Sequence, residues 1–139
     1  MIVPDASVLV VAVGDEGPAG EFARDLLRRA GQAALPDVAD VEAAAVLRKL
    51  WLAGAIGEAR LRAALEALRD LPFARFPARG FLGRYYDLRA NVSPYDAAYV
   101  ALAEALDAEL VTANRRLAGA PGLRCRVRLV PSTGSCPAS

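Results

Sequence analysis

The chain has 139 residues, 55% of them hydrophobic, and a formal net charge of +1. This length and composition suit one compact domain, which needs neither a disulfide nor a cofactor to build its core. The near-neutral charge excludes a global field that would attract nucleic acid or membrane, although the acid-free segment after Glu109 carries five arginines. Histidine is absent, which excludes a His-activated nucleophile, a His general base and a His-containing zinc site. Acid–base chemistry therefore has to use carboxylates, or water activated by a metal.

The cysteines and the apolar segments indicate a cytoplasmic protein. The chain has only two cysteines, Cys125 and Cys136, and both lie near its C-terminal end. This pattern does not fit a disulfide framework and is typical of a reducing compartment. The apolar run over residues 2–13 has no basic start and contains Asp5, so it predicts a core strand and helix instead of an export signal. No other stretch approaches the ~18 apolar residues of a membrane span. We therefore expect no contact with a membrane.

The N-terminal segment predicts a short strand followed by a helix. Residues 2–4 form the strand, Asp5 ends it, and the helix begins at Val8. Sites in open α/β sheets form at the carboxyl ends of strands, so Asp5 is a candidate site residue and Ser7 lies just behind it. The alternative is that Asp5 or Ser7 only caps the helix.

A second strand and helix follow an amphipathic helix at residues 21–30. Residues 32–36 predict the strand, and Asp37 is expected to cap a helix that runs to about Ala53. Glu42 lies in the first turns of that helix, close to its apolar side, where a buried carboxylate needs a partner. The alternative for Glu42 is an ordinary exposed helix glutamate.

The middle of the chain predicts a helical hairpin, a short strand and a further helix. The second helix of the hairpin covers residues 59–71, the strand covers 73–76, and the next helix covers 81–89. Trp51, in the first helix of the hairpin, is the predicted contact with a partner protein, because aromatic side chains favour the centres of interfaces.

The clearest helix start in the chain lies before a buried strand. Ser93 is the expected N-cap, and Asp96 stands three residues later, so Asp96 can serve the cap as well as a site. The helix over residues 94–106 is apolar around most of its circumference, which is typical of a buried helix. A strand at 109–112 follows, and Asn114 stands just past it.

Strands and helices alternate throughout, with an edge strand expected at 127–130. This order predicts a three-layer α/β/α domain with a mostly parallel central sheet over residues 1–130, followed by a mobile tail at 131–139. Four polar residues at strand ends or helix starts then meet at one edge of the sheet: Asp5, Glu42, Asp96 and Asn114.

Three carboxylates and a carboxamide form a hard-oxygen site that suits Mg²⁺ or Mn²⁺. Without a metal the carboxylates would repel one another, which raises their pKa values. A divalent ion beside a phosphodiester can orient water and neutralise charge in the transition state. The chemistry predicted for the site is therefore phosphodiester hydrolysis.

Four parts of the chain resemble the PIN-domain family, specifically its VapC toxins: Val3 to Ser7, Glu42 in its helix, Tyr95 to Ala103, and Leu110 to Leu117. The resemblance covers nearly the whole chain, to about Val130, and the run from Ser93 to Leu117 is its most specific part. It implies a PIN-like fold and a Mg²⁺- or Mn²⁺-dependent endoribonuclease of a type II toxin–antitoxin pair. The implied substrate is structured RNA such as tRNA or rRNA.

The resemblance also implies partners and site residues. Members of the family usually form homodimers and are silenced by a VapB antitoxin whose C-terminal segment enters the acidic site. By position, Asp5, Glu42 and Asp96 match the acidic metal ligands. Thr112 matches a hydroxyl that commonly sits beside the metal water, and Ser7 is assigned a supporting role. The candidates for holding RNA phosphates are Arg84, Arg89, Arg115 and Arg116.

Asn114 departs from the family, which more often has aspartate at this position. The neutral residue predicts weaker metal binding, with a single well-held ion. Two other functions stay open. An aspartyl-phosphate phosphatase is disfavoured, because Ser7 stands where a second aspartate is needed and Lys49, the only lysine, lies in a helix. A catalytically weak or inactive PIN-like module that binds RNA or a partner is permitted by Asn114.

Overall fold

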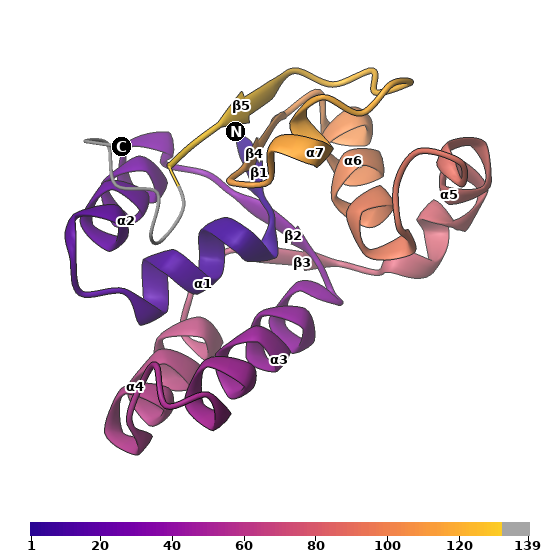
Figure 1. Cartoon of the computed structure of the whole chain (residues 1–139). Helices are drawn as coiled ribbons and strands as arrows, with labels where there is room; N and C mark the ends of the chain where they lie inside the picture. The colour runs from indigo at the N-terminus through magenta and orange to yellow at the C-terminus, as the bar shows by residue number, and fades with distance from the viewer. Residues whose placement is uncertain (132–139) are drawn as a thin grey trace.

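The computed structural model describes residues 1–131, and short parallel strands form its centre (Figure 1). The strands are β1 (Ile2–Pro4), β2 (Ala34–Pro36), β3 (Ala74–Phe76), β4 (Glu109–Thr112) and β5 (Val127–Leu129). β1, β4 and β5 form one ladder, and β2 pairs with β3. A parallel bridge between Ile2 and Ala33 joins the two ladders, which gives the strand order β3-β2-β1-β4-β5. The predicted mostly parallel sheet is confirmed.

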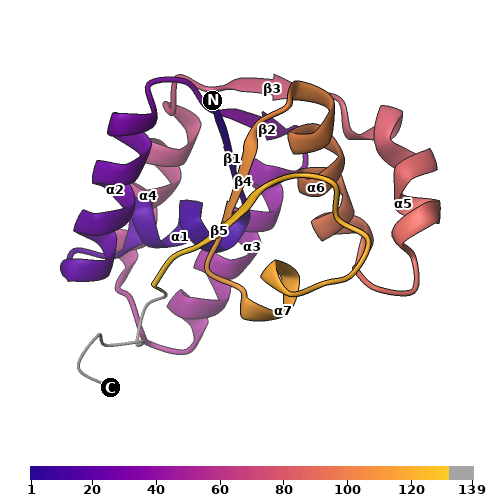
Figure 2. The ribbon, with the colours of Figure 1, turned by 90° about the horizontal axis from the view of Figure 1, so that it is seen from above.

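Helices cover both sides of the strands, as Figure 1 and Figure 2 show. α1 (Ala6–Gly14) and α2 (Pro18–Ala30) lie on one side, whereas α5 (Leu82–Leu88) and α6 (Pro94–Leu106) lie on the other. The remaining helices are α3 (Ala39–Leu52), α4 (Glu58–Arg69), the 3₁₀ helix η1 (Ala78–Phe81) and α7 (Arg115–Ala118). α3 and α4 form the predicted hairpin, which packs on α1.

The core follows the alternation of side chains along the strands. Val3 and Leu110 are opposite each other in the register of β1 and β4, and both belong to the core cluster that includes α6. Ile2 and Val111 point to the other face and pack with residues of α1 and α2. Both faces of the sheet are therefore buried, as expected for parallel strands between helical layers. The seven consecutive residues from Ala97 to Ala103 of α6 are all buried, which confirms the predicted buried helix.

Several element boundaries differ from the expectation. The prediction that Asp37 caps α3 is wrong: α3 follows Val38 without a side-chain cap, and Oδ1 of Asp37 accepts a hydrogen bond from the backbone N–H of Ala78 at 3.0 Å. α1 begins at Ala6, earlier than expected, because Asp5 itself caps it. Of the tail expected at 131–139, only Pro131 lies within the described residues. None of the helices in residues 1–131 is long and apolar enough to cross a bilayer.

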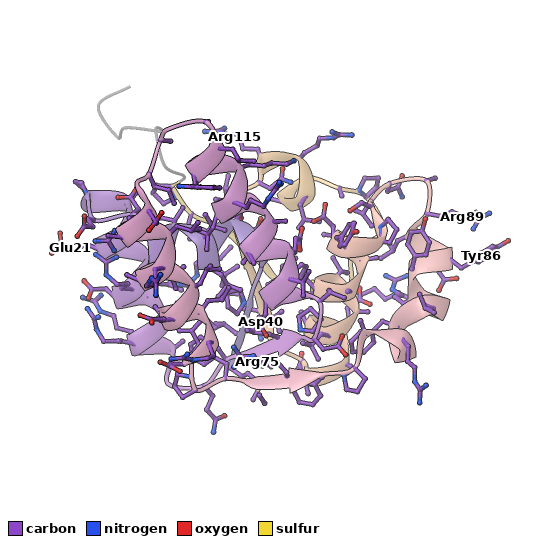
Figure 3. The ribbon with its side chains drawn as sticks, turned by 90° about the horizontal axis from the view of Figure 1, so that it is seen from below. Glu21, Asp40, Arg75, Tyr86, Arg89 and Arg115 are labelled. Carbon is purple, nitrogen blue, oxygen red and sulfur yellow. The ribbon has the colours of Figure 1, made fainter. Side chains whose placement is uncertain are left out.

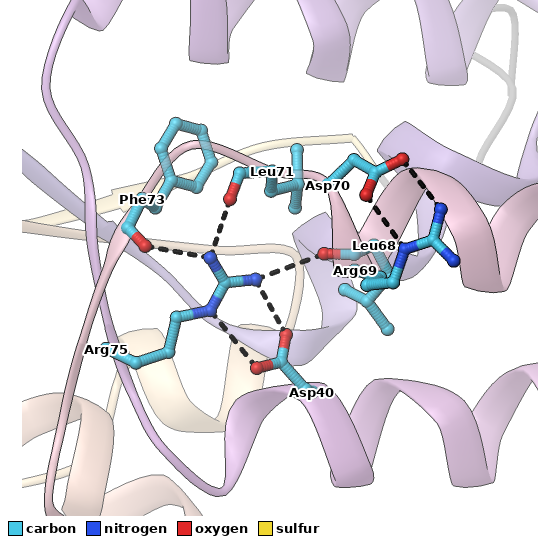
Figure 4. Close-up of polar contacts among 7 residues, drawn as sticks. All are labelled: Asp40, Leu68, Arg69, Asp70, Leu71, Phe73 and Arg75. Carbon is cyan, nitrogen blue, oxygen red and sulfur yellow. Dashed lines mark hydrogen bonds and ion pairs between the residues drawn. The ribbon is translucent and has the colours of Figure 1, made fainter.

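Arg75 of β3 fixes the start of α3 (Figure 4). Its guanidinium donates to both carboxylate oxygens of Asp40, at 3.1 and 3.0 Å. It also donates to backbone carbonyls at the end of α4 and in the following turn, those of Leu68, Leu71 and Phe73, at 2.6–3.1 Å. These contacts tie the end of α4 and the turn after it to the start of α3. They also hold the first turn of α3, in which Glu42 lies two residues after Asp40.

Candidate active site

Asp5 lies at the carboxyl end of β1 and is only 4% exposed. Its Oδ1 accepts hydrogen bonds from the backbone N–H groups of Ser7 and Val8, at 3.1 and 3.3 Å, so Asp5 is the N-cap of α1. The same oxygen accepts from the hydroxyl of Ser7 at 2.5 Å, and Oδ2 accepts from the hydroxyl of Thr112 at 2.5 Å. The carboxylate is therefore held rigidly by neutral donors.

The two hydroxyls that bond to Asp5 are themselves oriented by backbone amides. Oγ of Ser7 accepts the N–H of Ala113 at 2.9 Å, and Oγ1 of Thr112 accepts the N–H of Asn114 at 3.0 Å. Because each hydroxyl already accepts an amide hydrogen, its own hydrogen is free to point at Asp5. The segment just past β4 thus fixes the orientation of a carboxylate at the end of β1.

Glu42 lies in the first turn of α3 and is half-buried. The helix is held against the core by Ala39 and Ala43, both fully buried. Oε1 of Glu42 accepts a 2.7 Å hydrogen bond from the hydroxyl of Tyr99. Glu42 is therefore not the ordinary exposed helix residue that the sequence left open as an alternative.

Asp96 lies in the first turn of α6. Its backbone N–H donates to Oγ of Ser93 at 3.1 Å, so the predicted N-cap of α6 is present. Its carboxylate is half-buried and is close enough to Asp5 and Glu42 for its negative charge to raise the pKa of both. In the described residues, none of these three acids has an ion-pair partner within 4 Å.

The pKa values of all three carboxyl groups are raised. Burial is the largest cause for each. For Asp5, burial and the charge of Asp96 outweigh the hydrogen bonds from Ser7, Thr112 and Val8 that favour the charged form. For Glu42, burial and the charges of Asp96 and Asp5 outweigh the hydrogen bond from Tyr99. For Asp96, the Ser93 hydroxyl and the charge of Arg116 lower the pKa, but burial prevails. The cluster repels itself and would be stabilised by a cation.

The donor set fits a hard divalent ion in its chemistry, because it consists of carboxylate oxygens that lack a basic partner. The side-chain positions do not form a finished ligand cage. Within residues 1–131, no three acidic or cysteine side chains are arranged so that they could hold one metal ion together.

Asn114 follows β4 and is the N-cap of α7. Its Oδ1 accepts hydrogen bonds from the backbone N–H groups of Arg116 and Leu117, at 3.0 and 3.3 Å. The carbonyl oxygen that could bind a metal is thus engaged in capping a helix, and the side chain is exposed. The predicted role of Asn114 as a fourth member of the site stays a prediction, whereas its backbone N–H does support the site through Thr112.

Arg84 has a structural role that the sequence did not indicate. Its guanidinium donates to both carboxylate oxygens of Glu104, at 2.7 and 2.9 Å, and to the carbonyl of Gly122 at 2.7 Å. The side chains of Arg84 and Glu104 are only 15% and 14% exposed. The role of Arg84 as an RNA contact stays a prediction, but its Nε and Nη2 donors bond to α6 and to the loop after α7.

The other three predicted phosphate contacts are exposed. Arg115 and Arg116 lie in α7, next to Asn114, and Arg116 is close enough to Asp96 to lower its pKa. Arg89 stacks on Tyr86, with its Cζ 3.9 Å from the ring centroid, and donates to the carbonyl of Tyr86 at 2.7 Å. Figure 3 shows Arg89 and Tyr86 together on the outer side of α5, away from Arg115. α7 is thus the better-placed source of phosphate contacts.

The main residue that the sequence prediction missed is Tyr99. The sequence places it among the apolar residues of a buried helix, and within residues 1–131 it is the largest fully buried side chain. A signal was nevertheless present, because a buried tyrosine hydroxyl needs a hydrogen-bond partner and Tyr99 lies one turn after Asp96. Trp51, the predicted partner contact, is 39% exposed near the end of α3, and its role stays a prediction.

Residues 2–123 match the sequence profile of the PIN domain. The chain is 40% identical over 131 residues to ribonuclease VapC9 of Mycobacterium tuberculosis strain H37Rv, an alignment that covers 94% of this chain and 99% of that protein. It is 43% identical over 129 residues to ribonuclease VapC1 of the same strain, with coverage of 92% and 96%.

Two solved structures have a similar fold. PAE2754 from Pyrobaculum aerophilum superposes with a TM-score of 0.67 and 20% identity, over 91% of this chain and 81% of that one. VapBC2 from Rickettsia felis, bound to a DNA fragment from its promoter, gives a TM-score of 0.65 and 19% identity, over 93% and 98% of the two chains. At these identities the likeness concerns the fold alone, and it supports the arrangement of helices on both sides of a parallel sheet.

Proposed function

Because the chain belongs to the PIN domain family, we propose that it is a Mg²⁺- or Mn²⁺-dependent endoribonuclease of the VapC type that hydrolyses phosphodiester bonds. The observation that carries the proposal is the cluster of Asp5, Glu42 and Asp96. These three carboxylates repel one another, and among residues 1–131 none has an ion-pair partner. Such a cluster is unfavourable unless a cation completes it.

Asp5, Glu42 and Asp96 are the residues that would hold the ion. A bound divalent cation supplies activation of the attacking water and neutralisation of the charge that develops on the phosphate. Ser7 and Thr112 orient Asp5, and the partial burial of the cluster limits competition from bulk water. With no histidine in the chain, the proton of the attacking water has to pass to a carboxylate of this cluster or to solvent.

The substrate of the proposed nuclease is structured RNA such as tRNA or rRNA, in the cytoplasm. Arg115 and Arg116 are exposed on α7 beside the acidic cluster and can hold phosphates on either side of the cut. Arg89 provides a further contact farther out on α5. The local positive charge on α7 compensates for the acids, which would otherwise repel the RNA backbone.

A VapB-like antitoxin is the proposed inhibitor. A groove of about 650 Å³ borders Glu42, and most of its walls are apolar residues of α3 together with Tyr95. Val41 and Tyr95 in this groove are 74% and 57% exposed. An antitoxin segment with apolar residues and one basic side chain would fit the groove, because its cation could enter the acidic site.

A homodimer is the proposed oligomeric state, and Trp51 is a proposed contact with a partner. Trp51, Leu52 and Leu65 are exposed apolar residues of the hairpin formed by α3 and α4. Light scattering of the wild-type protein and of Trp51→Ala, with and without antitoxin, separates a dimer contact from an antitoxin contact. A monomeric wild-type protein would contradict the dimer.

A cleavage assay tests the nuclease. Wild-type protein should cut tRNA or rRNA fragments with Mg²⁺ or Mn²⁺ and should lose this activity in EDTA. Asp96→Asn and Glu42→Gln should cut no more than the EDTA control. Asp70→Asn, which changes an exposed acid paired with Arg69 at the end of α4, is the matched control and should cut as wild type does.

The second candidate function is an RNA- or partner-binding module that does not cut. It is favoured by the capping role of Asn114 and by the open ligand arrangement of the acids in residues 1–131. RNA binding without metal-dependent cleavage in the same assay would support this candidate over the nuclease.

A further inference from the structure

We infer that Tyr99 is a positioning residue, whose hydroxyl holds the Glu42 carboxylate in the orientation that the acidic site requires. The inference rests on the proposed function, because it concerns how this chain prepares Glu42 for a divalent ion. Tyr99 itself is fully buried and is not expected to touch the ion or the RNA.

The contact between these residues is the only hydrogen bond of the Glu42 side chain within the described residues. The hydroxyl of Tyr99 donates to Oε1 of Glu42 at 2.7 Å, and the two residues are 57 residues apart in the sequence. A glutamate side chain has several rotatable bonds and keeps many rotamers unless a contact selects one. One phenol hydrogen can bond to one oxygen, so Oε1 is fixed and Oε2 stays available for a cation or a water molecule.

The chemistry of the donor suits this role. An arginine or lysine at the same place would neutralise the carboxylate and compete with a metal for it. The phenol gives a hydrogen bond without a positive charge, and burial in the core fixes its ring. The phenol thus orients the Glu42 carboxylate without pairing it with a positive charge, and restricts its rotation away from Asp5 and Asp96.

The position of Tyr99 in α6 links two of the acids. Asp96 lies three residues earlier in the same helix, which places it about one turn away along α6. α6 therefore carries one carboxylate of the cluster and the donor that orients a second. A shift of α6 relative to α3 would move Asp96 and disturb the hydrogen bond from Tyr99 to Glu42 at the same time.

The test is Mn²⁺ binding in the absence of RNA, measured by electron paramagnetic resonance on the full chain. Tyr99→Phe keeps the ring and removes only the hydroxyl, and it should weaken Mn²⁺ binding about 10- to 100-fold, as loss of a residue that orients a ligand typically does. Excess Mn²⁺ should restore most of the RNA cleavage. The matched control is Tyr86→Phe, which removes an exposed hydroxyl from α5 and should leave Mn²⁺ affinity unchanged.

A double-mutant cycle distinguishes positioning from a general loss of structure. In a Glu42→Gln background, Tyr99→Phe should weaken Mn²⁺ binding by less than threefold, because the carboxylate that it positions is already gone. An equal loss in both backgrounds, unchanged binding by Tyr99→Phe, or a Tyr99→Phe protein that does not fold would each overturn the inference. Wild-type protein that binds no Mn²⁺ would instead overturn the proposed metal-dependent function.

Discussion

The hydroxyl of Thr112 donates a 2.5 Å hydrogen bond to Oδ2 of Asp5, and both residues are almost completely buried. Thr112 is the last residue of β4, and Asp5 directly follows β1, so the contact ties two neighbouring parallel strands together at their carboxyl ends. It also explains how a buried carboxylate is tolerated without a basic partner. Hydrogen bonds from neutral donors compensate part of the cost of burying the charge.

Replacing Thr112 by valine should therefore destabilise the protein. Valine keeps the shape but removes the donor to Asp5 and the acceptor for the N–H of Asn114, which should lower the free energy of unfolding by about 1–3 kcal/mol. Thr112→Ser keeps the hydroxyl and loses one methyl group, so its cost should be smaller, about 1 kcal/mol. Urea unfolding at pH 7 measures both. A serine variant less stable than the valine variant would contradict the role of the hydroxyl.

The metal-free protein should become less stable as the pH rises through the range in which its acidic cluster ionises. The pKa of Glu42 is raised in the folded state. The protonated Glu42 side chain therefore stabilises the fold fully below the unfolded pKa of glutamate, about 4.3. This stabilisation is lost as the pH rises through the folded pKa. Glu42→Gln keeps an oxygen for the Tyr99 hydroxyl but carries no charge. Its melting temperature in EDTA should exceed that of wild type at pH 7, and the difference should shrink towards pH 4.

Thermal melts across this pH range, with EDTA or with Mg²⁺, check the prediction. Carboxyl groups outside the cluster titrate as well, but they are common to both proteins and cancel in the comparison. Loss of the Glu42 charge also removes its repulsion with Asp5 and Asp96, which acts in the same direction. Mg²⁺ should raise the melting temperature of wild type more than that of Glu42→Gln. A constant difference at all pH values would show that the charge of Glu42 is not destabilising.

The acidic residues could be predicted because their positions follow from local sequence. Asp5 ends an apolar strand and Asp96 follows a Ser-Pro helix start, so the parallel topology alone brings them to one edge. Tyr99 could not be assigned, because its partner lies 57 residues away and its neighbours are all apolar. The sequence likewise shows the charge of Arg84 but not its partner. Glu104 lies 20 residues away and is brought to Arg84 by the packing of α5 on α6.

Arg84 should matter for stability and not for RNA binding. The pKa of Glu104 is lowered although burial acts in the opposite direction, because hydrogen bonds from Arg84 and from the N–H of Arg124 favour the carboxylate. The Glu104 carboxylate therefore stabilises the fold above the unfolded pKa of glutamate, and this stabilisation is lost as the pH falls through the folded pKa of Glu104. Arg84→Met leaves Glu104 largely buried without its partner and should cost about 3 kcal/mol at pH 7.

Urea unfolding of Arg84→Met and Glu104→Gln, together with RNA affinity at a temperature where both are folded, tests this assignment. Arg84→Lys keeps the charge but not the paired geometry, so it should fall between wild type and the methionine variant. RNA affinity that drops in Arg84→Met while stability stays the same would restore Arg84 to the phosphate contacts.

Asn114→Asp should tighten Mn²⁺ binding and raise RNA cleavage. Aspartate can keep the cap of α7, because its oxygen accepts from the same backbone N–H groups and its charge suits a helix start. It also adds a negative charge beside the cluster. Asn114→Ser preserves a cap without adding charge and is the control. If Asn114→Asp neither tightens Mn²⁺ binding nor increases cleavage, the neutral residue does not limit the site.

Arg116 should contribute directly to RNA affinity through a phosphate. It is exposed on α7, and its charge reaches Asp96, so it borders the site where the RNA backbone has to lie. Arg116→Ala should weaken binding to all RNA sequences alike and should reduce the slope of log affinity against log salt by about 1. Binding is measured over a series of salt concentrations without divalent metal, so that the RNA stays intact.

Arg29→Ala removes the same charge from α2, beside Ile2 at the amino ends of the strands, and should leave the slope unchanged. Equal slopes for Arg116→Ala and wild type would mean that RNA approaches the acidic cluster from a side other than α7.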